Sequence, residues 1–154
     1  VKYLNNNGVT YGKSGNTFAP DDAITRAEFT TLAVRFFDVY GDGNKDIMEQ
    51  YKDFDDVSDG YWAAEYIKAA AKSGWINGYE DGSFLADRNI SRAEVVTIVN
   101  RLLGREADES YIVDNLRKLN TFSDMSGKHW AYYAVMEAAN AHTAILGENE
   151  TWSK

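Results

Sequence analysis

The stretch ITRAEFTTLAVRF at residues 24–36 returns as ISRAEVVTIVNRL at residues 90–102, 66 positions later. Over the 30 positions that begin at Gly8 and Gly74, the gapless alignment keeps 10 identical residues, which chance seldom produces. Similarity at a fixed spacing is typical of proteins assembled from repeated structural units. We therefore expect a fold built from copies of one unit.

Each copy carries the signature of a helix start. In a capping box, the hydroxyl of Thr25 or Ser91 accepts the amide of the third helical residue, and Glu28 or Glu94 reaches back to the cap. The following apolar residues recur at near-helical spacing, which predicts helices to about residues 38 and 103 with Arg35 and Arg101 facing water. The predicted buried stripes are Ala27, Leu32 and Phe36 in the first copy and Ala93, Ile98 and Leu102 in the second.

A second module repeats at an offset of 68, where residues 54–71 match residues 122–139 and Trp62 matches Trp130. Its alanine-rich continuation predicts a second helix that packs closely against its neighbours. We expect one domain over 1–154, with the second half of repeat one at 1–41, a complete repeat two at 54–105, and the first half and a degraded tail of repeat three at 122–154. Units of this size cannot bury their apolar faces singly, so the predicted fold class is mostly α, with repeated helix–loop–helix units.

A glycine-rich loop joins the two helices of the complete repeat. Its residues Asn77, Gly78, Tyr79 and Gly82 have two interpretations. The glycines can provide the positive φ angles of a tight turn, or they can let backbone amides approach a ligand. We expect the loop to be ordered in both cases. Gly104, and by analogy Gly41, is expected to end its helix in the left-handed conformation.

The composition excludes several classes of protein. The 154 residues carry a net charge of −8, which argues against binding to nucleic-acid phosphates as the main function. The apolar runs are far shorter than the roughly 20 residues that span a bilayer, so we expect no membrane insertion. The absence of cysteine rules out disulfides, thiol nucleophiles and cysteine zinc sites.

The repeated motifs together resemble the S-layer homology family of bacterial cell-surface anchoring modules. The likeness rests on Phe-x-Asp-Val/Met-x…Trp-Ala at 54–63 and 122–131, on Gly-Tyr-Glu-Asp-Gly-Ser-Phe at 78–84, and on Ile-Thr/Ser-Arg-Ala-Glu at 24–28 and 90–94. The resemblance implies a pseudo-threefold, spindle-like helical bundle. It also implies that grooves between repeats bind secondary cell wall polysaccharide, often through a pyruvylated sugar. In this chain, repeat one lacks its tryptophan half and repeat three lacks its arginine motif.

The resemblance also indicates candidate ligand-binding residues. Arginine directly after a helix cap is unfavourable, because the positive end of the helix dipole repels a cation. The family places Arg26 and Arg92 in grooves that meet an acidic sugar, and a guanidinium can hold a carboxylate with two parallel hydrogen bonds. The alternative is a structural salt bridge. We hypothesise the pairs Arg26 with Trp62 and Arg92 with Trp130, whose indoles either stack on sugars or pack between helices.

Metal and catalytic motifs are weak. Residues 42–46 resemble the start of a calcium loop, but Ile47 replaces its glycine and Asp53 its bidentate glutamate, so a solvated acidic linker is expected. His129 and His142 lie 13 positions apart and form no zinc motif. His129 adjoins Trp130 and is a further candidate contact to a ligand. We therefore expect no metal, no cofactor and no catalytic residues.

The function expected from these observations is non-covalent binding of cell wall polysaccharide, which anchors an exported, extracellular protein to the cell wall or S-layer. One alternative is a structural module that self-assembles through its incomplete repeats. Another is an accessory domain of a glycan-processing enzyme. A monomer is the working expectation, and the oligomeric state stays open.

Overall fold

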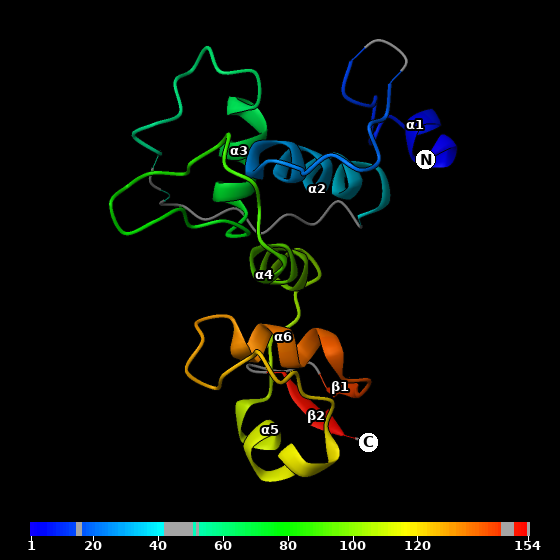
Figure 1. Ribbon diagram of the computed structural model, residues 1–154, viewed down its shortest axis with the longest axis vertical. Helices are drawn as coiled ribbons and strands as arrows, with labels where there is room; N and C mark the ends of the chain where they lie inside the picture. The colour runs from blue at the N-terminus through cyan, green and yellow to red at the C-terminus, as the bar shows by residue number, and fades with distance from the viewer. Residues whose placement is uncertain (15–16, 42–50, 52, 146–149, 154) are drawn as a thin grey trace. The chain divides into compact units, whose positions relative to one another are not determined.

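The computed structural model describes residues 1–14, 17–41, 51, 53–145 and 150–153, so the acidic linker at 42–46 lies outside the described residues. The chain forms two compact units, Val1–Ile90 and Ser91–Lys154, and their boundary falls within the predicted second repeat. The elements in the first unit are the helices α1 (Lys2–Asn6), α2 (Arg26–Tyr40) and α3 (Ala64–Lys72). Those in the second are α4 (Arg92–Leu102), α5 (Glu109–Asn115), the 3-10 helix η1 (Leu116–Lys118), α6 (Tyr132–Ala139), and the strands β1 (Thr143–Ile145) and β2 (Thr151–Ser153). The predicted mostly α class is confirmed (Figure 1).

Both predicted capping boxes are present. The hydroxyl of Thr25 accepts the amide of Glu28 at 3.2 Å, and the Glu28 carboxylate accepts the amide of Thr25 at 2.9 Å. Ser91 and Glu94 make the same two bonds at 3.2 and 2.8 Å. These reciprocal bonds satisfy amides that a helix start leaves without intrahelical partners, and they fix where α2 and α4 begin.

In the first unit, α2 packs against α3, and most of the core is made of small side chains that let the helices approach closely. Phe84, from the glycine-rich loop, is fully buried and stacks on Phe54 with ring centroids 5.1 Å apart. Trp75 follows α3 and packs against Phe37 of α2. The other buried apolar residues of this unit are Val9, Ala27, Ala33, Val34, Ala63, Ile67, Ala70, Ala71, Ile76 and Ala86.

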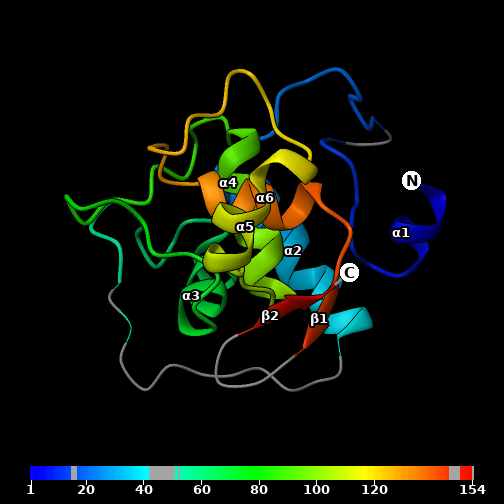
Figure 2. The same ribbon diagram turned by 90° about the horizontal axis from the view of Figure 1, so that it is seen from below.

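In the second unit, α4 packs against α6, and the two short strands form an antiparallel pair in which Ala144 lies opposite Trp152 (Figures 1 and 2). Ile112 of α5, Met136 of α6 and Trp152 of β2 form the core of this unit. The strand pair therefore covers the helices through one large aromatic side chain.

Three expectations from the sequence are wrong in detail. Phe36, expected in the buried stripe, is exposed, because α2 is covered on the side that carries Thr30, Thr31 and Val34 instead. Gly41 ends α2 at φ −69°, outside the left-handed region, whereas Gly104 adopts the predicted left-handed conformation at φ +62°. The third concerns Arg35, which contacts two aromatic rings and is described with the candidate site.

Candidate functional site

A cavity of the first unit has a volume of about 600 Å³. Small-molecule sites in proteins commonly occupy roughly 300–1,000 Å³, so this space suits one or two sugar residues. One wall is the face of α2 that carries Glu28, Thr31 and Arg35, and Trp62 closes it from the start of the α3 segment. The rest of the lining comes from the loop that precedes α2, with Thr10, Tyr11, Gly12, Lys13, Phe18, Ala19, Pro20, Asp22, Ala23 and Ile24.

Three aromatic side chains of this cavity are largely exposed: Tyr11, Phe18 and Trp62. Trp62 keeps 56% of its surface accessible, which removes the interpretation that it is a helix-packing core residue. Exposed aromatic faces on a concave surface suit the apolar side of a pyranose ring. The cavity therefore has the surface chemistry of a sugar-binding site.

Arg35 is the arginine of this cavity, and its prediction as a water-facing residue is wrong. Its guanidinium lies 5.1 Å from the ring centre of Tyr11 and 4.8 Å from that of Tyr66, and it donates to the Tyr66 hydroxyl at 3.1 and 3.2 Å. Within the described part of the chain, Arg35 forms no ion pair with a carboxylate. Cation–π contacts hold such a group in place while leaving its charge uncompensated.

The positive and negative side chains that line the cavity are equal in number. Lys13 donates to Asp22 at 2.7 Å, and this hydrogen bond, together with the charge of Asp22, raises the pKa of Lys13. Lys13 and Arg35 formally cancel Asp22 and Glu28, although the whole chain carries −8. An anionic sugar therefore meets no net negative charge at this lining. The hydroxyl of Thr31, in the α2 wall, is buried and has no hydrogen-bond partner among the described residues.

Arg26 lies outside the lining of this cavity and is only 6% exposed. Its Nε donates to the carbonyl oxygen of Phe84 at 2.7 Å, and its guanidinium lies over the rings of Phe84 and Tyr79. The amides of Arg26 and Ala27 donate to carbonyls of the segment that follows Phe84, both at 2.9 Å. Arg26 therefore joins the start of α2 to the glycine-rich loop, and the cavity brings Trp62 together with Arg35 rather than with Arg26.

The glycine-rich loop forms a tight turn. The amide of Tyr79 donates to the carbonyl of Ser83 at 2.8 Å, and the amide of Gly82 donates to the carbonyl of Tyr79 at 3.0 Å. Gly78 and Gly82 have φ angles of +66° and +87°, and Asn77 is exposed. The Tyr79 hydroxyl accepts a hydrogen bond from Arg88. The backbone amides of Tyr79 and Gly82 therefore donate their hydrogen bonds within the turn itself.

The loop is also held from the tryptophan module. The carboxylate of Asp56 accepts the amides of Phe84 and Leu85 at 2.7 and 2.8 Å. The Tyr61 hydroxyl donates to Asp87 at 2.6 Å, and burial, with this bond, raises the pKa of Tyr61 to about 12. Tyr61 neighbours Trp62, so the loop and the aromatic side of the cavity are positioned by the same short segment.

In the second unit, Arg92 and Trp130 are both exposed, and Trp130 keeps 65% of its surface accessible. Within the described residues, no hydrogen bond, ion pair or ring contact joins them. Trp130 instead packs against His129, with ring centroids 5.6 Å apart. Both members of the second hypothesised pair are thus exposed at the surface of the second unit.

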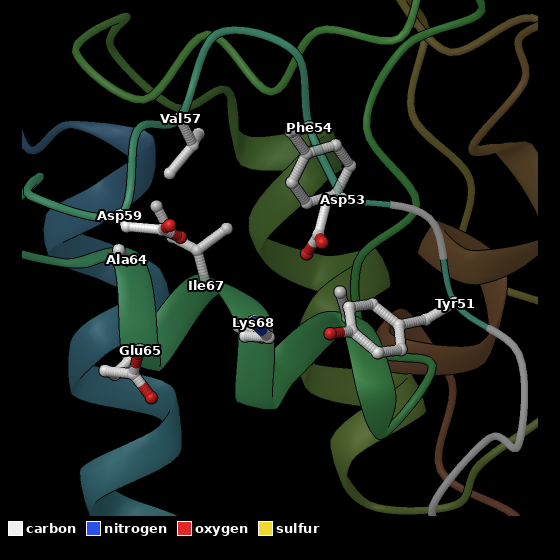
Figure 3. Close-up of a pocket in the computed structure, with 10 residues that line it drawn as sticks. Tyr51, Asp53, Phe54, Val57, Asp59, Ala64, Glu65, Ile67 and Lys68 are labelled. Atoms are coloured by element: carbon white, nitrogen blue, oxygen red, sulfur yellow. The ribbon is translucent and has the colours of Figure 1, made fainter.

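A smaller cavity of the first unit lies along α3 (Figure 3). Its volume of about 90 Å³ is well below that of typical ligand sites. Tyr51 and Asp53 flank it, and a hydrogen bond with Tyr51 raises the pKa of Lys68. This space suits water molecules rather than a saccharide.

Sequence reasoning missed two features. Arg35 is one of the ten repeated identities, but nothing local indicated that Tyr11 and Tyr66 would enclose it. The second feature is a buried cluster of Glu137, His142 and Glu150 in the second unit, whose residues share no motif.

Comparison with known proteins agrees with these observations. The S-layer homology domain model matches residues 1–30 and 53–96. The chain is 32% identical over 151 residues to a cellulosome-anchoring protein of Acetivibrio thermocellus, covering 97% of this chain and 31% of that protein. It is 32% identical over 106 residues to a surface layer protein of Brevibacillus choshinensis, covering 69% of this chain and 9% of that protein. An endoglucanase of a Bacillus species is 30% identical over 126 residues, covering 82% of this chain and 12% of the enzyme.

The chain thus spans less than a third of the length of each of these relatives. They include proteins of the cell surface and the S-layer, which confirms the expected cell-wall or S-layer location. No helix among the described residues is long and apolar enough to cross a membrane. The repeated motifs, the helical fold and these similarities together show that the chain belongs to the S-layer homology domain family.

Proposed function

We propose that this chain binds secondary cell wall polysaccharide, carrying a pyruvylated sugar, and thereby anchors an exported protein to the bacterial envelope. S-layer homology domains are cell-wall anchoring modules rather than catalytic ones, and enzymes such as the endoglucanase relative carry them as accessory parts. The observation that carries the proposal is the 600 Å³ cavity in which the exposed Trp62 and Tyr11 flank Arg35.

The roles of the cavity residues follow from their contacts. Trp62, Tyr11 and Phe18 stack on the apolar faces of the sugars. The carboxylate of the ketal pairs with Arg35, whose guanidinium is fixed by Tyr66 and has no competing carboxylate in the described part of the chain. Because a fixed guanidinium loses less side-chain freedom on binding, the pairing gains affinity from preorganisation.

Arg26 acts differently in this proposal from the role that the family resemblance implies. It sets the position of α2, and with it Arg35, through its bond to Phe84. The loop on the far side of that bond is shaped by Asn77, Gly78, Tyr79 and Gly82. Arg92 and Trp130, exposed in the second unit, form a second and weaker contact region for the same polymer.

A set of matched variants tests this assignment by isothermal titration with the purified polysaccharide. Trp62→Ala and Arg35→Met each remove one contact, and methionine retains much of the packing between the two tyrosine rings. Each is expected to weaken binding at least tenfold. Trp130→Ala removes an equally exposed indole outside the cavity and is expected to change the affinity less than threefold. Equal losses for Trp62→Ala and Trp130→Ala would contradict the placement of the site.

Self-assembly is the second candidate function, and one surface favours it. Phe36 and Tyr40 of α2 are exposed and pack together with ring centroids 4.9 Å apart, and Tyr3 stacks on Tyr40 at 6.2 Å. Light scattering over a hundredfold range of concentration tests this. A mass that rises with concentration in the wild type and stays constant in Tyr40→Ser supports assembly, and a constant wild-type mass excludes it.

A further inference from the structure

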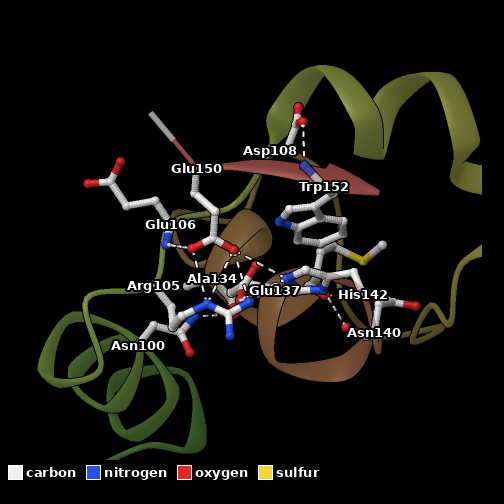
Figure 4. A network of polar contacts seen from close by, with 11 residues as sticks. Asn100, Arg105, Glu106, Asp108, Ala134, Glu137, Asn140, His142, Glu150 and Trp152 are labelled. Atoms are coloured by element: carbon white, nitrogen blue, oxygen red, sulfur yellow. Dashed lines mark hydrogen bonds and ion pairs between the residues drawn. The ribbon is translucent and has the colours of Figure 1, made fainter. Parts of the chain in front are cut away.

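Three buried side chains of the second unit converge on one point (Figure 4). Glu137 comes from α6, His142 directly precedes β1, and Glu150 directly precedes β2. The His142 Nε2 lies 3.3 Å from the Glu137 Oε1 and 3.3 Å from the Glu150 Oε1. One ligand atom of each residue lies within 4.8 Å of the others.

The imidazole is oriented with its acceptor atom toward the two carboxylates. Its Nδ1 lies 2.7 Å from the carbonyl oxygen of Asn140, and a carbonyl only accepts, so Nδ1 carries the proton. The Nε2 faces Glu137, Glu150 and the Nη2 of Arg105, and it accepts in the contact with Arg105 because a guanidinium only donates. Trp152 stacks on the imidazole, with centroids 3.9 Å apart at 11°, and fixes its plane. A backbone bond of this kind commonly orients histidines that ligate metals.

A guanidinium nitrogen occupies the point on which these atoms converge. The Arg105 Nη2 lies 3.0 Å from the Glu137 Oε1 and 2.9 Å from the Glu150 Oε1, and it contacts the His142 Nε2. One guanidinium therefore serves two buried carboxyl groups. The Oε2 of Glu137, which is only 5% exposed, is buried without a hydrogen-bond partner among the described residues.

We propose that Glu137, His142 and Glu150 form a binding site for a divalent transition-metal ion of the Zn²⁺ class, whose place Arg105 occupies in the metal-free chain. Tetrahedral Zn²⁺ with bonds of about 2.0–2.2 Å separates its ligand atoms by about 3.3–3.6 Å. The two measured separations of 3.3 Å agree with that edge. Two carboxylates and one neutral imidazole balance the charge of the ion, and the Arg105 side chain, 32% exposed, has a route to solvent.

The bound ion would join α6 to both strands. Since Glu150 precedes β2 and His142 precedes β1, a single ion ties the strand pair to the helix that packs on α4. The proposal is independent of polysaccharide binding, because none of these residues belongs to the polysaccharide contacts proposed above.

Zn²⁺ titration of the chelator-treated chain tests the site, with Ca²⁺ as the control cation because it prefers oxygen ligands. We expect one Zn²⁺ per chain and a rise in the midpoint of thermal unfolding, with no response to Ca²⁺. His142→Ala is expected to weaken Zn²⁺ binding at least a hundredfold. The matched variant His129→Ala, which removes the other histidine at an exposed position, leaves it unchanged.

Arg105→Gln provides the sharper test, since removal of the competing cation is expected to tighten Zn²⁺ binding at least tenfold. A second test uses the wild-type protein alone. When Co²⁺ is bound in place of Zn²⁺, we expect the visible absorption bands of a tetrahedral Co²⁺ site. Absence of Zn²⁺ binding by the folded wild-type chain, absence of the Co²⁺ bands, or loss of binding in His129→Ala would each overturn the proposal.

Discussion

Replacement of Gly78 by alanine tests the tight-turn interpretation of the glycine-rich loop. Gly78 has a φ of +66°, in the left-handed region that disfavours residues with a Cβ. A Cβ built there would lie 2.4 Å from the Phe54 ring and 2.7 Å from the carbonyl oxygen of Ser83. The ring belongs to the buried Phe54–Phe84 pair, and the Ser83 carbonyl already accepts the amide of Tyr79, so neither neighbour moves freely.

The expected cost of Gly78→Ala combines two effects. The left-handed conformation costs about 1–2 kcal/mol for a residue with a Cβ. Insertion of a methyl group into a filled site costs about 1–3 kcal/mol more. The free energy of unfolding is therefore expected to fall by about 2–5 kcal/mol, a large share of the total for a small domain.

Two glycines serve as matched controls for this substitution. Gly104 has a φ of +62° with nothing within 4 Å of a built Cβ, so Gly104→Ala is expected to cost only about 1–2 kcal/mol. Gly60 has open space and no positive φ, so Gly60→Ala is expected to stay within about 0.5 kcal/mol of wild type. Urea unfolding followed by circular dichroism measures all three variants. A Gly78→Ala cost no larger than that of Gly104→Ala would refute the contacts with Phe54 and Ser83.

Two further predictions concern the contacts that hold the same loop. Asp56→Ala removes the acceptor of two backbone amides, including that of Phe84, and is expected to cost about 2–3 kcal/mol in urea unfolding, whereas Asp55→Ala stays near wild type. Burial, followed by the hydrogen bond to Asp87, raises the pKa of Tyr61 to about 12, so the neutral tyrosine stabilises the fold below about pH 10 and this contribution is lost between pH 10 and 12. Tyr61→Phe should therefore flatten this alkaline decline in stability, and an unchanged decline would contradict the assignment.

Local features of the fold were predictable from the sequence. The capping boxes at Thr25 and Ser91 depend on residues three positions apart, so the pattern alone locates the starts of α2 and α4. The left-handed end of α4 at Gly104 is equally local. Phe36 was misplaced because the helical period identifies a face of a helix without saying what covers it.

The candidate sites depended on tertiary contacts that no local pattern contains. Arg35 was expected to face water, and only the fold brings Tyr11 and Tyr66 to opposite sides of it. Arg26 looked like a ligand contact because a cation at a helix start is unfavourable, but its bond to the Phe84 carbonyl, 58 positions away, accounts for that choice.

The cluster of Glu137, His142 and Glu150 illustrates the same limit. Its histidine and two glutamates occur at irregular spacing, and the antiparallel pairing of β1 with β2 brings Glu150 back to His142. The spacing of the two histidines shows no zinc motif, and a site with one histidine and two carboxylates leaves no trace in that spacing.

The central claim is tested most directly by isothermal titration of the folded chain. One titration uses pyruvylated cell wall polysaccharide, and the other uses the same polymer after removal of the ketal. The account predicts saturable binding of the intact polymer that is lost on ketal removal, since Arg35 then has no carboxylate to pair with. Equal binding of both polymers, or binding of neither by the folded chain, would contradict it.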